Sequence, residues 1–199
     1  MNQTINALRT RAIRSTEALI LRCKQGDRDA FRELVDAHQQ YAFALAFRIL
    51  CDEDDARDVV QESFISIWKH ILEYNPRNLF TTWMYRIVTN KAKDRLKANI
   101  RRENVMSRDV PAMNAASGSN MLDQELANKD LAERIRSLAE NLPITQRLVF
   151  ILRDIQDLSV PETAEALSIS QGSVKTHLCH ARAYLRRAIT DIDTTTRGV

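Results

Sequence analysis

The chain has 199 residues, of which 44% are hydrophobic and 28% are charged, and its formal net charge is +3 at pH 7. It contains no apolar run close to the roughly 20 residues that are needed to cross a bilayer, and its three cysteines form no C-x-x-C pair. We therefore expect a cytoplasmic protein of one or two soluble domains that needs no disulfide, metal ion or cofactor.

Helical patterns run through the chain, since only four glycines and four prolines interrupt it and strand-like alternation is not sustained anywhere. We predict an all-α protein with two small helical domains, a four-helix N-terminal domain and a C-terminal helix-turn-helix domain, joined by a flexible linker. The N-terminal helices are expected at residues 16–24, 27–50, 53–72 and 79–102. The C-terminal helices are expected at residues 123–141, 144–154, 160–167 and 171–189.

Local chemistry supports these boundaries. Gly26 can take the left-handed conformation that ends a helix, Asp27 and Asp52 can cap the helices that follow, and Pro76 cannot continue one. A polar stretch of small residues begins at Asn104 and has no apolar period. The predicted parts are an N-terminal extension at residues 1–15, a first domain at 16–103, a linker at 104–122, a second domain at 123–189 and a tail at 190–199.

The third predicted helix carries a dense acidic charge, because residues 51–62 hold six acidic side chains and one arginine. One face of this helix has the apolar spacing of a buried stripe, and another face gathers Asp58, Gln61, Glu62 and Ile65. An acidic and amide face beside one exposed aliphatic residue suits docking onto a basic partner helix. A solvated polar face is the simpler alternative.

The fourth predicted helix is basic, since residues 77–108 hold nine Lys and Arg side chains against two acids. Trp83 and Tyr85 lie near its start. Aromatic rings followed by a ladder of cations suit a separated DNA strand, whose bases can stack while its phosphates meet the cations. Trp83 shares a helical face with Ile87, so a place in the core explains it equally well.

The last two predicted helices have the pattern of a helix-turn-helix. A three-residue turn follows residues 160–167, and the next helix turns an apolar stripe inward, formed by Val174, Leu178, Ala181 and Leu185. Its opposite face is short-chained and polar at the start, where base edges would be read, and basic further on, where phosphates would lie. A helical hairpin in an unrelated bundle would share this spacing, but four basic residues and no acid lie at 171–187.

Three stretches together resemble, in order and spacing, the core-binding, promoter-melting and helix-turn-helix regions of extracytoplasmic-function (ECF) sigma factors. They are DDARDVVQESFISIW at residues 54–68, FTTWMYRIVTNKAKDRLK at 80–97 and LPITQRLVFILRDIQDLSVPETAEALSISQGSVKTHLCHARAYLRR at 142–187. The string DVVQE with the tryptophan that follows it is specific to sigma factors. The resemblance implies a non-enzymatic subunit that binds the RNA polymerase core and directs promoter recognition and transcription initiation, in a stress or envelope response.

The resemblance also implies partners and sites. Asp58, Gln61 and Glu62 would meet the clamp helices of the largest polymerase subunit. The minus-ten element of the promoter DNA would be held by Arg77, Asn78, Phe80, Trp83, Arg86, Asn90, Lys91, Lys93, Arg95 and Lys97. The minus-thirty-five element would be read by Gln171, Ser173, Lys175, Thr176, His177, His180 and Arg182. The C-terminal domain would lean on the flap of the second large subunit, and an anti-sigma factor is a further implied partner.

The chain departs from the family pattern at two places. Ser168 stands where glycine is usual, so the turn is expected to differ slightly, and Lys175-Thr176-His177 stands where Arg or Lys, Ser and Arg are commoner. A stand-alone helix-turn-helix regulator is the main rival interpretation. An enzyme is a remote one, because P-loop, H-E-x-x-H and G-x-S-x-G motifs are all missing from the sequence.

Overall fold

The computed structural model describes residues 15–77, 79–106 and 141–196, and every regular element within these ranges is helical. The all-α fold predicted from the sequence is thereby confirmed. None of the helices in the described ranges is long and apolar enough to span a membrane. The N-terminal extension up to residue 14, the linker beyond Met106 and nearly all of the helix predicted at 123–141 lie outside the described residues.

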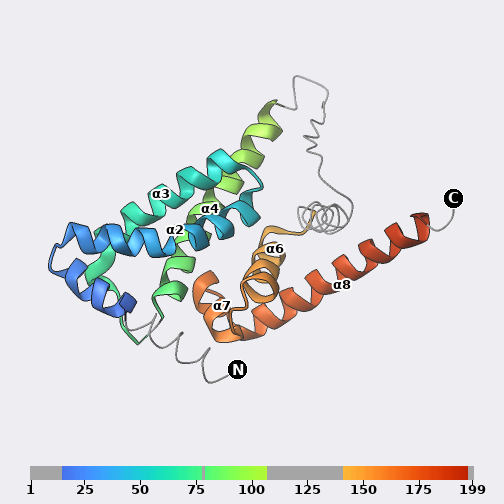
Figure 1. Ribbon diagram of the computed structural model, residues 1–199. Coiled ribbons are helices and arrows are strands. Elements are labelled where there is room, and N and C mark those ends of the chain that lie inside the picture. Colours follow the sequence, from blue (N-terminus) through green and yellow to red (C-terminus); the bar gives the residue numbers. More distant parts are fainter. Residues whose placement is uncertain (1–14, 78, 107–140, 197–199) are drawn as a thin grey trace.

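The N-terminal half is a helical bundle (Figure 1). After a first helix at residues 15–24 come α2 (Arg28–Leu50), α3 (Glu53–His70), the 3-10 turn η1 (Ile71–Glu73) and α4 (Phe80–Met106). Both predicted caps form, because the Asp27 carboxylate accepts from the backbone N–H of Ala30 at 3.0 Å and Asp52 accepts from that of Asp55 at 2.8 Å. Gly26 has the expected positive φ of 87°, which lets the chain turn sharply before α2.

The C-terminal half is made of shorter helices around one long one. Its elements are α6 (Ile144–Phe150), the π-helical turn η2 (Ile151–Ile155), α7 (Val160–Leu167) and α8 (Gln171–Thr196). The helix predicted at 144–154 therefore widens at Ile151, whose carbonyl accepts from the N–H of Gln156 at 2.9 Å. Ser159 and Glu162 begin α7 with a capping box, in which each side chain accepts from the backbone N–H of the other residue.

Two helices are longer than predicted. α4 continues to Met106 instead of ending at Arg102, and α8 continues to Thr196 instead of ending at Ile189. The polar composition of both stretches predicted a linker and a tail, but neither stretch contains Gly or Pro. Adding a residue to an existing helix is far less costly than starting a helix, so polar side chains alone do not end one.

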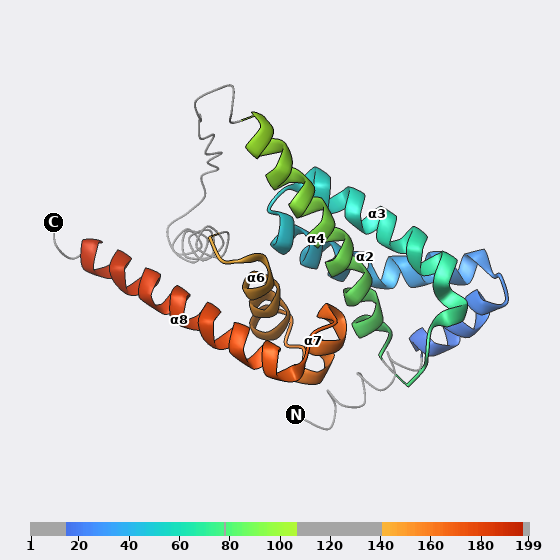
Figure 2. The same ribbon diagram turned by 180° about the vertical axis from the view of Figure 1, so that it is seen from behind.

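The two halves pack directly against each other. α7 lies beside the first turns of α4 in both views (Figures 1 and 2). Leu148, Ile151, Leu152 and Leu158 of the C-terminal half are buried in the same apolar core as the side chains of α2, α3 and α4. The two predicted domains thus pack against each other through apolar side chains.

Candidate functional site

The acidic face of α3 is divided between two neighbours. Asp58 and Glu62 turn toward α4, where their carboxylates lie 3.4 and 3.3 Å from the guanidinium of Arg95. Gln61 instead lines the groove between α2 and α3, together with Ile65. All three residues predicted to bind the core polymerase are exposed, but they border different surfaces.

Arg95 is the centre of a charged cluster that sequence reasoning missed. Its guanidinium pairs with Asp55 at 2.5 Å, and the Asn99 amide donates to the same carboxylate at 2.6 Å. The hydrogen bond from Asn99 and then the pairing with Arg95 hold the pKa of Asp55 below its usual value. Lys91 lies 3.5 Å from Glu62. Lys91 and Arg95, both predicted to contact DNA, are therefore turned toward α3.

A groove of about 1050 Å³ runs between α2 and α3. Its floor includes the ring of Phe31, which lies 4.8 Å from the ring of Trp68, measured between centroids. Ile65 lines the groove and is 49% exposed. Positive charge is supplied to the lining by Arg28, Arg32 and Arg57. An apolar floor with a polar rim is the usual anatomy of a protein–protein interface.

A basic stripe follows the outer face of α4. Its members recur at spacings of four, three and four residues, which places them on one side of the helix; they are Arg86, Asn90, Lys93 and Lys97. Asn90 and Lys97 are exposed, and Arg86 and Lys93 are half-buried. The six polar side chains of α4 that were predicted to contact the minus-ten element thus divide into this outward stripe and the two residues that face α3, Lys91 and Arg95.

Phe80 and Trp83 belong to the core. They are only 4% and 9% exposed, and the centroid of the Trp83 ring lies 6.0 Å from that of Phe80 and 5.3 Å from that of Tyr74. For Trp83, the core alternative that the sequence left open is the one that the structure shows. Phe80 is packed in the same core, so neither ring lies on the surface of the protein without DNA, and their contact with the minus-ten element stays a prediction.

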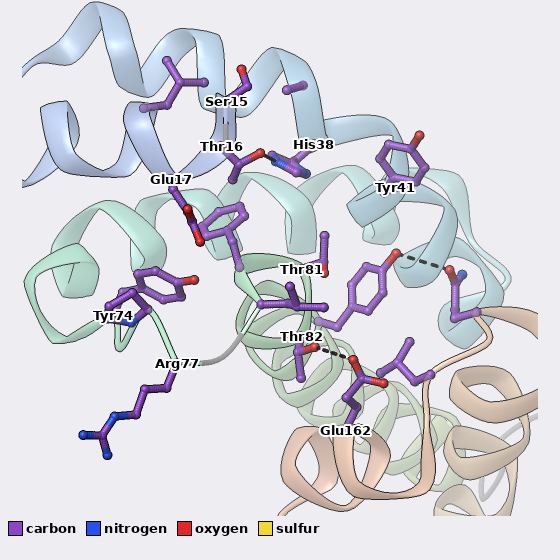
Figure 3. Close-up of a pocket in the computed structure, with 18 of the residues that line it drawn as sticks. Ser15, Thr16, Glu17, His38, Tyr41, Tyr74, Arg77, Thr81, Thr82 and Glu162 are labelled. Atoms are coloured by element: carbon purple, nitrogen blue, oxygen red, sulfur yellow. Dashed lines mark hydrogen bonds between the residues drawn. The ribbon is translucent and has the colours of Figure 1, made fainter. Parts of the chain in front are cut away.

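The loop between α3 and α4 borders a cavity of about 570 Å³ where the two halves meet (Figure 3). The cavity is lined by His38 of α2, by Arg77 of the loop and by Glu162 of α7. Arg77 is exposed, and its backbone N–H donates to the Asn75 side chain at 3.0 Å, which fixes the turn. Its side chain extends away from the cavity (Figure 3). Asn78, a further predicted minus-ten contact, lies outside the described residues.

The helix-turn-helix forms as predicted, with α7 followed by a short turn and α8. Val174 and Leu178 are buried on the inner side of α8, and the Ser170 hydroxyl caps this helix by accepting from the N–H of Ser173 at 3.0 Å. Ser168 has φ 54° and ψ 45°, a left-handed conformation that glycine takes without strain. The turn is therefore kept although serine replaces the usual glycine.

The outer face of α8 carries the residues predicted to read the minus-thirty-five element. Those that are exposed are Gln171, Lys175, Thr176, His180 and Arg182, whereas Ser173 and His177 are half-buried. Arg182 already has an acidic partner, because its Nε donates to Asp154 Oδ2 at 2.8 Å and its second nitrogen donates to the other carboxylate oxygen. This pairing raises the pKa of Arg182.

A helix-turn-helix packed against a helical bundle that carries a basic helix is typical of a DNA-binding protein of two helical units. The family model for sigma-70 region 2 matches residues 34–102, and that for sigma-70 region 4 matches residues 132–185. The ECF sigma factor SigW of Bacillus subtilis is 31% identical over 183 residues, which cover 87% of this chain and 96% of SigW. The ECF sigma-E factor of Haemophilus influenzae is 32% identical over 181 residues, 87% of this chain and 94% of the relative.

Solved structures agree with these matches. CnrH, solved in complex with the cytosolic domain of CnrY, has a TM-score of 0.64 and 27% identity over 90% of this chain and 99% of its own. The sigma factor RpoE of Bartonella quintana, solved with the anti-sigma factor NepR, has a TM-score of 0.64 at 17% identity and supports the fold alone.

This chain belongs to the ECF sigma factors. It is a subunit that binds RNA polymerase and directs promoter recognition and transcription initiation, and it is not an enzyme.

Proposed function

We propose that the groove between α2 and α3 is the surface that docks on the clamp helices of the largest polymerase subunit. The observation that carries this proposal is Ile65, an aliphatic side chain that stays 49% exposed beside an apolar floor. Gln61 lies on the groove side of α3, and Asp58 and Glu62 lie on the adjoining side, where they add acidic charge. Apolar contact would supply affinity, and the acids would steer the approach of a basic partner.

The two DNA elements would be met by different halves. The α4 stripe of Arg86, Asn90, Lys93 and Lys97 offers cations and an amide along one face, which suits the phosphates of a separated minus-ten strand. The exposed start of α8 would read the minus-thirty-five element in the major groove, since its short polar side chains let the helix approach base edges. The C-terminal half would also lean on the flap of the second large subunit.

An anti-sigma factor is a further proposed partner. The relative CnrH, 27% identical, was solved with the cytosolic domain of CnrY bound to it. A groove with an apolar floor and a charged rim is the kind of surface that receives an amphipathic helix from another protein. An inhibitor seated in the groove between α2 and α3 would compete directly with the polymerase clamp. A role in a stress or envelope response is proposed on the resemblance alone.

The groove is tested by binding to purified core polymerase, followed by run-off transcription. We expect Ile65→Glu to weaken core binding about thirtyfold or more, the range of an interface hot spot. The control is Leu21→Glu, which makes the same change at a residue that is 64% exposed and does not line the groove. Equal binding of the two variants would exclude the groove as the docking site, while run-off activity of the parent chain tests the sigma function itself.

A further inference from the structure

Arg147 on α6 is a buried cation that lacks a carboxylate partner among the residues that the structure describes. It is only 5% exposed, and its Nε makes no hydrogen bond within the described ranges. Buried charges are usually paired, because an ion that leaves water loses its hydration and recovers the energy only from a counter-charge. A guanidinium in this position therefore favours a negative group beside it.

The hydrogen bond that this guanidinium makes goes to a sulfur atom. Nη2 of Arg147 donates to Cys51 Sγ at 3.0 Å. Cys51 directly follows the last residue of α2 and is half-buried, so a small solute can reach its sulfur. A positive charge beside a cysteine favours the thiolate over the thiol, and the thiolate is the nucleophilic form.

Acidic residues also lie near Cys51, because residues 52–55 are all Asp or Glu. Their charges oppose a thiolate, but the last three already pair with Arg57 of α3 or Arg95 of α4. The first of them caps α3 through its carboxylate and is exposed. Salt and water screen exposed charges much more than buried ones. The buried guanidinium of Arg147 is therefore the dominant charge at the Cys51 sulfur.

The other two cysteines differ from Cys51 in this respect. Cys23 is only 2% exposed, and burial raises the pKa of its thiol, which makes a cysteine inert. Cys179 is exposed on α8, and the guanidinium of Arg182, one turn further along that helix, is held by Asp154. If exposure alone set the reactivity, Cys179 would react first. If the buried cation sets it, Cys51 reacts first.

We propose that Cys51 is an oxidation site for hydrogen peroxide and that Arg147 activates its sulfur. The thiolate attacks one peroxide oxygen, an S–O bond forms as the O–O bond breaks, and hydroxide leaves. The sulfur is oxidised by two electrons to a sulfenic acid, and the peroxide is reduced. The new oxygen is a stronger acceptor for the guanidinium than the sulfur was. Cys51 does not line the groove between α2 and α3, so the proposed clamp surface keeps its chemistry.

Competition among the three cysteines of the full chain tests the proposal. The reduced protein is treated with hydrogen peroxide in the presence of dimedone, which traps sulfenic acids, and peptide mass spectrometry measures the labelling rate of each cysteine. We expect Cys51 to be labelled on the order of tenfold faster than Cys179. Cys23 should stay unlabelled, which shows that the protein remained folded. If Cys179 is labelled as fast as Cys51 or faster, the proposal is wrong.

Two variants separate the charge of Arg147 from its packing. Arg147→Met removes the cation and keeps a long side chain, and it should slow the labelling of Cys51 on the order of tenfold. Arg147→Lys keeps the cation and should retain most of the parent rate. Cys179 is the internal control, with the same rate in all three proteins. An unchanged Cys51 rate in Arg147→Met, or an equal loss in both variants, would overturn the role of the charge.

Circular dichroism establishes that both variants keep their helical content. If Arg147→Met does not fold, the comparison of Cys51 with Cys179 in the parent chain decides the question by itself.

Discussion

The two halves of the molecule build their interiors in different ways. In the N-terminal half, α2, α3 and α4 have 23, 18 and 27 residues and enclose one continuous core. In the C-terminal half, α6 and α7 have only seven and eight residues. Its own interior consists of two small clusters, one around Val174 and Leu178 and the other around Ala181 and Leu185.

Because of this difference, the stability of the C-terminal half should depend on the N-terminal half more than the reverse. A small helical unit buries too little of its surface to be very stable alone. The C-terminal half compensates by placing Leu148, Ile151 and Leu152 in the interior of its larger neighbour. The N-terminal core, by contrast, is formed mainly by its own helices. We therefore expect substitutions that destabilise the N-terminal half to destabilise the C-terminal half as well. Substitutions in the C-terminal half should have much less effect on the N-terminal half.

The largest effect is expected from the N-terminal core. Ile67 is completely buried on α3, and Ile67→Ala should lower the free energy of unfolding by about 3 kcal/mol through lost burial and the cavity that remains. Hydrogen exchange should show faster exchange in both halves of this variant. The control is Ile65→Ala on the same helix, at a side chain that is 49% exposed, where the loss should stay below about 0.5 kcal/mol.

The matching C-terminal variant decides whether the dependence is one-sided. Leu178→Ala removes a buried side chain of the small cluster beside α7, and it should speed hydrogen exchange in α6, α7 and α8 while α3 keeps its protection. If α3 loses as much protection as α8 does, the halves unfold as one cooperative unit and the comparison fails.

The next largest difference in stability is expected between the ion-pair clusters of the two halves. Arg95 is 25% exposed and pairs with three carboxylates of α3, so Arg95→Ala leaves Asp55, itself 21% exposed, without its ion-pair partner. We expect a loss of about 2 kcal/mol. In the C-terminal half, Arg182 is 52% exposed in its pair with Asp154, and Arg182→Ala should cost only about 0.5 kcal/mol. Urea denaturation measures both, and equal losses would contradict the ranking.

Local chemistry explains why much of the fold could be predicted from the sequence. The caps at Asp27 and Asp52 and the turn at Gly26 depend on residues within one turn of the helix end. The ends of α4 and α8 were missed because neither extension contains a helix-breaking residue, and composition alone does not end a helix. The packing of α7 on α4 brings together residues 80 positions apart, as in the hydrogen bond from Thr82 to Glu162. No pattern in the sequence predicts this contact.

The candidate site was predicted only in part for the same reason. Helical spacing places Asp58 and Glu62 on a common side of α3, but it does not say which neighbour covers that side. Arg95 lies 37 residues from Asp58 and 33 from Glu62. One signal was available, since acids four residues apart on one helix match Lys91 and Arg95 four residues apart on the next. Trp83 shows the same limit, because its spacing fitted the core and a DNA surface equally well.

The turns of the two halves are expected to differ by a smaller amount. Ser168 adopts φ 54° in the C-terminal turn, whereas the N-terminal turn uses Gly26 at φ 87°. A side chain in the left-handed region costs about 1 kcal/mol, so Ser168→Gly should raise the free energy of unfolding by about that amount. Gly26→Ser should lower it by a similar amount, although open space surrounds that position. Thermal unfolding of both variants checks that the two changes in stability have opposite signs. A loss of stability in Ser168→Gly would refute backbone strain at Ser168.

The DNA-reading surfaces of the halves can be compared through their salt dependence. Lys175→Ala on α8 should lower the slope of log affinity against log salt by about one unit on a duplex that carries only the minus-thirty-five element. Lys97→Ala on α4 should leave the slope on this duplex unchanged. Arg182→Ala should change it less than Lys175→Ala does, because Asp154 already holds that guanidinium. Filter binding of the holoenzyme measures all three.

Base reading on the same duplex should behave differently. Thr176→Ala or His180→Ala should shift the preference among upstream sequences instead of changing the salt slope, since these short exposed side chains lie where base edges would be met. A uniform loss on every upstream sequence would remove the base-reading role of α8 and leave only phosphate contact.

The smallest effect concerns His38, at the cavity where the halves meet. His38 is 8% exposed, its Nε2 lies 3.4 Å from the Thr16 hydroxyl, and its Nδ1 has no hydrogen-bond partner among the described residues. Burial lowers the pKa of this imidazole in the folded protein. Below the unfolded pKa of about 6.5, the unfolded chain therefore binds a proton that the folded chain does not, so stability is lost as the pH falls.

His38→Gln isolates this dependence, because glutamine keeps a hydrogen-bonding group near Thr16 and does not titrate. Urea denaturation between pH 7 and pH 5 should show the parent losing stability relative to His38→Gln, with the two curves parallel above pH 7. Glu17 and Asp157 line the same cavity, but they are present in both proteins and cancel in the comparison. If the difference between the two proteins stays constant across this range, the imidazole is solvated in the folded state.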